Sequence, residues 1–209
     1  MSGGMVSAGP VDGQKGRLGR PWVRCAVVAV LVCLLLAAAA MGGWWWTHPS
    51  KLVSPVLGET GGLVRMVVEP GEEYVVSVAQ LAPSESREQL TFSAAEVDVV
   101  LAASSGTGAV SGIDTEVMTC TMDPDSDVAV GAGPVADGWL DPCLAVRPIS
   151  RSGGVMGGGE DEEELLLRFR AEGPARYKLR GVDLTYRGKG TFAQRGTQRI
   201  PANLTIVVK

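Results

Sequence analysis

The segment Cys25–Trp46, C-A-V-V-A-V-L-V-C-L-L-L-A-A-A-A-M-G-G-W-W-W, sets the layout of the chain. Its 22 residues carry no charge, and as a helix they are long enough to cross the ~30 Å hydrocarbon core of a bilayer. Basic residues collect on the cytoplasmic side of a membrane helix, and tryptophans collect at its interfaces. We therefore expect a cytoplasmic N-terminus, with the tryptophans at the outer interface. The basic residues that precede the segment are Lys15, Arg17, Arg20 and Arg24.

This segment divides the chain into four parts. We expect a disordered cytoplasmic tail at 1–24, a signal-anchor transmembrane helix at 25–46, a linker at 47–62 and an extracytoplasmic domain at 63–209. The expected location is the cell membrane, crossed once. The alternative is a cleaved signal peptide and a secreted β-domain protein, because Ala38–Ala40 fits an A-x-A cleavage site. The apolar run exceeds the roughly 7–15 residues of a signal-peptide core, which favours the anchor.

After the linker, apolar and polar residues alternate with the period of two that β-strands show. The clearest case is Glu163–Ala171, with leucine and phenylalanine on one face and mainly arginine on the other. The alternation shifts by one residue after Gly181, which predicts a β-bulge. Pro201 suggests that the last strand lies at a sheet edge. The other expected strands are Leu63–Val68, Tyr74–Leu81, Leu90–Leu101, Glu116–Met122, Cys143–Val146, Tyr177–Tyr186 and Ile200–Val208.

About seven to nine short strands, with no amphipathic helix after residue 47, predict a mainly β domain. We expect an antiparallel β-sandwich of immunoglobulin-like type behind the single helix. This layout and the segment Tyr177–Arg187, Y-K-L-R-G-V-D-L-T-Y-R, resemble uncharacterised single-pass membrane proteins of high-GC Gram-positive bacteria. The resemblance implies an immunoglobulin-like extracytoplasmic domain and assigns no role to any residue.

The four cysteines fall into two pairs. Cys25 and Cys33 lie in the apolar helix, whereas Cys120 and Cys143 lie in the β domain. In an oxidising compartment we expect Cys120 and Cys143 to form a disulfide. The loop-entropy relation gives such a bridge a stabilisation of roughly 3 kcal/mol.

The net charge of −4 conceals a strong asymmetry. Residues 1–24 carry +3, residues 51–175 carry −14 and residues 176–209 carry +7. We expect the basic C-terminal strands to fold beside the acidic strand Glu160–Ala171 and to pair with acids there. The alternative is contact with an anionic surface, such as lipid headgroups or a cell-wall polymer. The residues concerned are Arg176, Lys178, Arg180, Arg187, Lys189, Arg195 and Arg199.

Two acidic motifs invite comparison with metal sites. Asp123, Asp125 and Asp127 have D-x-D-x-D spacing, but Val128 and Pro134 stand where a calcium loop needs glycine and glutamate. We interpret this motif as a solvated loop, with a weak cation site shared with Asp137 or Asp141 as the alternative. The second motif, the acidic run Glu160–Glu164, is interpreted as a solvated loop end, with pairing to the basic C-terminal hairpin as its alternative.

Enzyme chemistry has little support in the sequence. His48 is the only histidine and lies in the linker, so a histidine-based triad or zinc site in the domain is excluded. We expect no catalytic residue, no metal and no cofactor. Nucleic acid is not an expected ligand, because no aromatic residues alternate with the basic residues to stack on bases.

The sequence therefore predicts a membrane-anchored, extracytoplasmic and non-enzymatic binding or accessory module. Its expected partners are the membrane and a protein or cell-envelope component. A structural subunit of a membrane protein complex is the alternative function, because Ala37–Gly43 offers small residues for close helix packing.

Overall fold

The computed structural model describes residues 20–54, 64–82, 88–104, 112–126, 130–149, 153–159, 162–189 and 193–209, with side chains of 20–24 and 104 excepted. The predicted tail and residues 55–62 of the predicted linker thus lie mostly or wholly outside the description. The chain forms two compact units, Met1–Gly42 and Gly43–Lys209.

Helix α1, Arg20–Thr47, begins five residues before the predicted span. Its part Cys25–Thr47 has a mean hydropathy of 2.7 and is long and apolar enough to cross a membrane. A signal sequence near the N-terminus would meet the same criterion. The helix ends at Thr47, since Pro49 follows closely and disfavours helical conformation in the residue before it.

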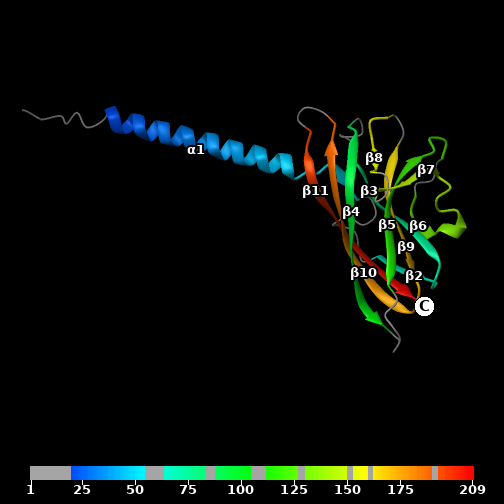
Figure 1. Ribbon diagram of the computed structural model, residues 1–209. Coiled ribbons are helices and arrows are strands. Elements are labelled where there is room, and N and C mark those ends of the chain that lie inside the picture. Colours follow the sequence, from blue (N-terminus) through cyan, green and yellow to red (C-terminus); the bar gives the residue numbers. More distant parts are fainter. Residues whose placement is uncertain are drawn as a thin grey trace, which may run out of the picture. The chain divides into compact units, whose positions relative to one another are not determined.

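The β domain consists of two sheets that form two layers (Figure 1). Sheet A has the strand order β1-β3-β9-β5-β7, and β6 also pairs with β3. All its pairs are antiparallel. Strand β1 lies inside the stretch predicted as linker. The bounds are Leu52–Val53 for β1, Glu73–Leu81 for β3, Ile113–Met122 for β5, Ala132–Pro134 for β6, Cys143–Pro148 for β7 and Glu163–Ala171 for β9.

Sheet B has the strand order β2-β11-β10-β4-β8. Its pairs are antiparallel except β2 with β11, which is parallel. Strand β11 lies between β2 and β10 and is not an edge strand, but β2 pairs only with Leu204–Val208, so Pro201 itself has no described partner strand on that side. Pro201 is opposite Gly181, where the predicted bulge is confirmed by a register shift, and an irregular ladder tolerates proline. The bounds are Val64–Val68 for β2, Leu90–Ser104 for β4, Val155–Met156 for β8, Ala175–Gly188 for β10 and Arg195–Val208 for β11.

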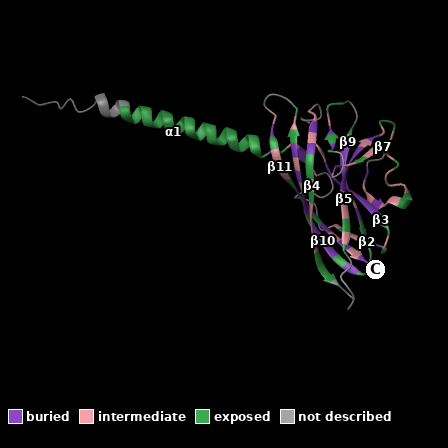
Figure 2. Cartoon of the chain, viewed as in Figure 1, coloured by how far each residue is buried: buried purple, intermediate pink, exposed green. Residues whose placement is uncertain are grey.

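The main core lies between the two sheets, where the inward side chains of both are buried (Figure 2). Aromatic pairs strengthen it within each sheet: Tyr74 stacks on Phe169 with ring centres 5.8 Å apart, and Phe92 lies 5.5 Å from Tyr186. The predicted mainly β fold with one apolar N-terminal helix is thus confirmed.

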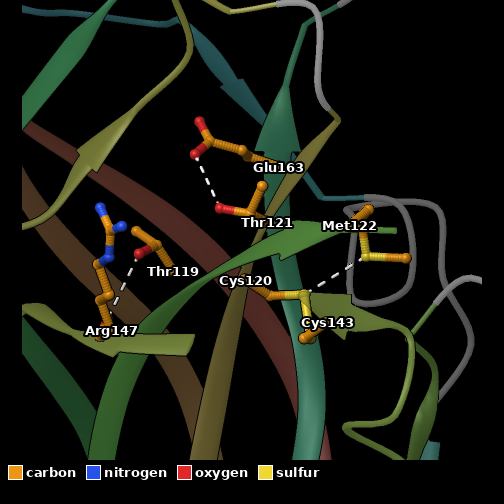
Figure 3. The surroundings of a disulfide bond; sticks show 7 residues. All are labelled: Thr119, Cys120, Thr121, Met122, Cys143, Arg147 and Glu163. Carbon is orange, nitrogen blue, oxygen red and sulfur yellow. Dashed lines mark hydrogen bonds between the residues drawn. A yellow bond between two sulfur atoms is a disulfide. The ribbon is translucent and has the colours of Figure 1, made fainter. Parts of the chain in front are cut away.

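A second, smaller core lies on the outer face of sheet A. There, residues 130–142, which we call the cover segment, pack Val130 and Trp139 against outward side chains of β3, β5 and β9. The segment includes β6 and a 3-10 turn, Val135–Asp137. The disulfide Cys120–Cys143 joins β5 to the first residue of β7, directly after the cover segment (Figure 3), so the predicted pairing is present.

Candidate functional site

The basic residues singled out by the sequence lie on the outer face of sheet B. In β10, Tyr177 and Leu179 are buried, whereas Arg176, Lys178 and Arg180 are exposed. This follows from the geometry of a strand, in which successive side chains point to opposite faces of the sheet. The three basic side chains therefore form a row on the solvent side.

The expectation that these strands lie beside the acidic strand is wrong. Strand β9 belongs to sheet A, and β10 belongs to sheet B. The short connection between Ala171 and Ala175 carries the chain from one sheet to the other. Consequently β10 pairs with β4 and β11, and its outward side chains face away from the acidic strand.

Arg199 is the one residue of the seven that has acidic partners among the described residues. Its guanidinium donates hydrogen bonds to Asp98 on β4 and, at 2.8 Å, to Asp183 on β10. The hydrogen bond to Asp98 and the charge of Asp183 raise the pKa of Arg199. This ion-pair cluster occupies the middle of the outer face and divides the remaining basic residues into two groups.

The first group lies towards the C-terminal end of β11. We call Arg65, Arg176, Lys178 and Arg180 the distal basic strip; all four are exposed. Thr205 of β11 is opposite Lys178 on one side and Arg65 on the other, so these two lie in one row, about 10 Å apart across three strands. None of the four has a carboxylate partner within the described part of the chain.

The sequence analysis missed Arg65. Its alternation within β2 marks it as an outward residue, but only the parallel pairing of β2 with β11 brings it beside β10. Parallel pairing over such a sequence separation leaves no local pattern.

The second group lies at the β10–β11 hairpin. Arg187 and Arg195 are directly opposite each other in the ladder, and Lys189 follows. All three side chains are exposed and lack a carboxylate partner among the described residues. Lys178 and Arg187 are nine positions apart on β10, which corresponds to about 30 Å. The seven predicted residues therefore do not form one site.

The acidic motifs have local roles in the structure. The backbone N–H of Asp125 donates to Asp123 Oδ1 at 3.0 Å, which closes a tight turn, and Asp127 lies outside the described residues. In the described part of the chain, no three acidic, cysteine or histidine residues form a group that could hold a metal ion. Glu163 accepts a hydrogen bond from Thr121 at 3.3 Å (Figure 3), while Glu160 and Asp161 are not described.

Among the described residues, Glu164 is the one buried carboxyl; it is 8% exposed and lies on the outer face of sheet A. Burial raises its pKa, the nearby Ser77 hydroxyl lowers it, and the charge of Glu162 raises it further. Its Oε2 atom has no hydrogen-bond partner. Glu164 is therefore a group whose charge opposes folding.

Neither the protein-family models nor the curated proteins compared with this chain give a match. The functional argument therefore depends on the geometry of the two basic groups.

Proposed function

We propose that the protein is a membrane-anchored, extracytoplasmic, non-enzymatic binding module that presents sheet B to an anionic component of the cell envelope. The long apolar helix supports the anchor. The Cys120–Cys143 disulfide supports an oxidising compartment and hence the outward placement of the domain. The immunoglobulin-like character of the sandwich belongs to the same proposal.

The observation that carries this proposal is the distal basic strip. Four exposed cations lie on β10 and β2, the two strands that flank β11, and no described carboxylate neutralises them. An extended polyanion can cross such a flat, regular row of charges and contact several of them together. Each basic side chain near an anionic surface contributes about 1 kcal/mol, and this contribution falls as salt screens it.

The test is binding of the full chain, in a non-ionic detergent, to poly(glycerol phosphate) as a soluble polyanion. Neutralising Arg176, Lys178 and Arg180 to glutamine should weaken binding about 100-fold at low salt, because three cations at about 1 kcal/mol each contribute about 3 kcal/mol. The matched control neutralises Arg187, Lys189 and Arg195 on the same hairpin and should keep most of the affinity. Equal binding by the wild type and the distal variant would refute the proposal.

A second candidate function, a subunit of a membrane protein complex, has its own supporting observation. Among the described residues, β8 pairs only with Leu90 and Thr91 of the long strand β4. The following stretch Ala94–Leu101 pairs with β10 on one side and has no described strand on the other. Such an edge accepts a strand from another chain.

This second function predicts a stable larger assembly after extraction in mild detergent. Adding charge to the open edge with Ala94→Lys and Val100→Lys should dissociate that assembly, because lysine protects edges from pairing. A monomeric wild-type protein would rule out this candidate and leave the binding module.

A further inference from the structure

The two arginines of the β10–β11 hairpin, Arg187 and Arg195, are placed to share one bound anion. Arg187 and Arg195 are opposite each other, and two positions along the ladder the hydroxyl oxygens of Thr185 and Thr197 lie 2.8 Å apart on the same face. Like charges directly opposite each other in an antiparallel pair are unfavourable. No carboxylate among the described residues lies between these two guanidinium groups. A shared anion would convert the repulsion into two favourable contacts.

A hollow of about 520 Å³ lies beside the arginine pair. Its volume falls within the range of small-molecule sites. The exposed lining of the hollow is mainly apolar, and its polar groups are the two guanidinium groups and four hydroxyls. The hydroxyls of Thr47, Ser93 and Thr185 already make hydrogen bonds within the described residues, so the Thr91 hydroxyl is the one left to donate to an anion oxygen. The hydroxyl residues are Thr47, Thr91, Ser93 and Thr185.

Thr47 is the last residue of the apolar helix, and its last turn belongs to the same compact unit as the hairpin. Gln194 donates a hydrogen bond to the carbonyl oxygen of Trp45 at 2.9 Å. Gly196 has a φ of 144°, and a Cβ there would lie 2.2 Å from the Thr47 carbonyl oxygen. Glycine therefore permits the close approach that brings the hairpin to the helix end.

Within the described residues, neither hairpin arginine makes a hydrogen bond to a carbonyl group of the last helical turn, and other side chains bind three of these carbonyl groups. The Thr47 hydroxyl donates to the oxygens of Gly43 and Trp44, each at 3.1 Å. His48 Nδ1 lies 2.8 Å from the Trp44 carbonyl oxygen, and the Gln194 side chain donates a hydrogen bond to the Trp45 carbonyl oxygen. The charges of Arg187 and Arg195 thus remain available to a ligand.

We propose that Arg187 and Arg195 bind the phosphate group of an anionic lipid headgroup in this hollow. The proposal rests on the proposed membrane anchor, because an apolar helix that ends at Trp44–Thr47 places its last turn among headgroups. Guanidinium groups bind phosphate oxygens with paired, charge-assisted hydrogen bonds. The phosphate would lie between the two arginines, beside the Thr91 hydroxyl.

The experiment uses the full chain in a non-ionic detergent and measures binding of dihexanoyl phosphatidylglycerol by calorimetry, below the micelle concentration of the lipid. Dihexanoyl phosphatidylcholine and inorganic phosphate are the comparison probes. We expect phosphatidylglycerol to bind at least tenfold more tightly than either. The choline cation of the first probe repels the arginines, and the second lacks acyl chains. Inorganic phosphate binding as tightly as the anionic lipid would overturn the lipid assignment.

The double variant R187Q/R195Q should lose at least tenfold in affinity for phosphatidylglycerol. The matched variant R176Q/K178Q, which removes two exposed cations from the distal basic strip, should bind the lipid as the wild type does. Unchanged binding by R187Q/R195Q, or an equal loss in both variants, would overturn the proposed site. If the double variant does not fold, the single variant R195Q is measured instead, and its affinity for phosphatidylglycerol should fall at least threefold.

The proposed lipid site and the proposed polyanion binding can be refuted independently of each other. Loss of the lipid site would leave polyanion binding by the distal basic strip intact, since that binding is tested with a soluble polymer and with different residues. Loss of polyanion binding would likewise leave the calorimetric result with the lipid unchanged.

Discussion

The outer faces of the two sheets differ in how many of their basic residues have carboxylate partners. On sheet A, Arg168 forms a hydrogen-bonded ion pair with Glu116, and Arg170 lies 2.7 Å from Glu172. Part of the same face is also covered by the cover segment. On sheet B, the distal basic strip and the hairpin arginines lie open to solvent, and no described carboxylate pairs with them.

This difference shows that topology, more than composition, decides where charges are neutralised. The acidic majority of residues 51–175 and the basic majority of residues 176–209 suggest mutual pairing. The change of sheet between β9 and β10 separates them instead. Arg168 and Arg170 of sheet A have carboxylate partners, whereas on sheet B Arg199 has them and the other basic residues selected from the sequence have none among the described residues.

The largest expected effect concerns the disulfide between the neighbouring strands β5 and β7 of sheet A, which closes the chain loop that contains the cover segment. Replacing Cys120 and Cys143 by alanine should lower the free energy of unfolding by about 3 kcal/mol, because the unfolded chain gains loop entropy. Urea denaturation of the full chain in detergent measures the change. The control C25A/C33A, in the apolar helix, should leave the domain unchanged. Equal stability of the wild type and C120A/C143A would mean that packing alone holds the cover.

The next prediction concerns packing within the cover segment, where Gly133 lies against the indole ring of Trp139. A Cβ at Gly133 would lie 2.1 Å from Trp139 Nε1, so Gly133→Ala should displace the indole. We expect a loss of about 2 kcal/mol, typical of overpacking. Gly112→Ala is the matched control, because nothing lies within 4 Å of its added Cβ. A melting temperature of G133A equal to that of G112A would contradict the described packing.

A smaller effect, with a defined pH dependence, concerns Glu164 on the covered face. Burial raises its pKa, so the folded state holds the proton more tightly than the unfolded state. Its contribution to stability is therefore full below the ordinary pKa of glutamate and is lost as the pH rises through the folded pKa. Glu164→Gln should stabilise the protein at neutral pH by about 1 kcal/mol, the order of cost of an unsatisfied buried group.

The pH series separates this effect from simple packing. The advantage of E164Q over the wild type should shrink as the pH falls towards the ordinary pKa of glutamate. Glu163→Gln should instead destabilise the domain, because Glu163 accepts hydrogen bonds from Thr121 and from the Gly157 backbone. A stability difference between E164Q and the wild type that does not change with pH would contradict the raised pKa.

The smallest effect compares the two faces directly. Arg168→Gln breaks the ion pair with Glu116 on sheet A and should cost about 0.5 kcal/mol, typical of exposed pairs. Lys178→Gln on sheet B removes a charge without a described partner and should cost nothing measurable. Thermal unfolding in low salt compares the two variants. A greater loss for K178Q than for R168Q would reverse the comparison.

Local features of the fold were predictable from the sequence, and long-range ones were not. Strand β9 has the predicted bounds, Glu163–Ala171, because strict alternation is a local signal. The bulge at Gly181 was visible as a phase shift for the same reason. The parallel partner of β2 and the sheet change after Ala171 depend on contacts between distant segments, which alternation does not encode.

The same difference between local and long-range features applies to the candidate site. The sequence identified Arg176, Lys178 and Arg180 as a row on one strand face, and the structure has them there. It could not add Arg65 from β2, nor separate Arg187 and Arg195 as a second group beside the helix end. It also could not assign Arg199 to internal ion pairs, because Asp98 becomes its neighbour only through the pairing of β4 with β10.

The most direct test of the account measures stability and ligand binding on the same variant, R176Q/K178Q/R180Q. If these residues form an open contact surface, the free energy of unfolding should stay within about 0.5 kcal/mol of the wild type, the range of surface substitutions. Its salt-sensitive binding to poly(glycerol phosphate) should fall at least tenfold. A clear loss of stability with unchanged polyanion binding would show instead that the basic residues of sheet B are neutralised within the fold.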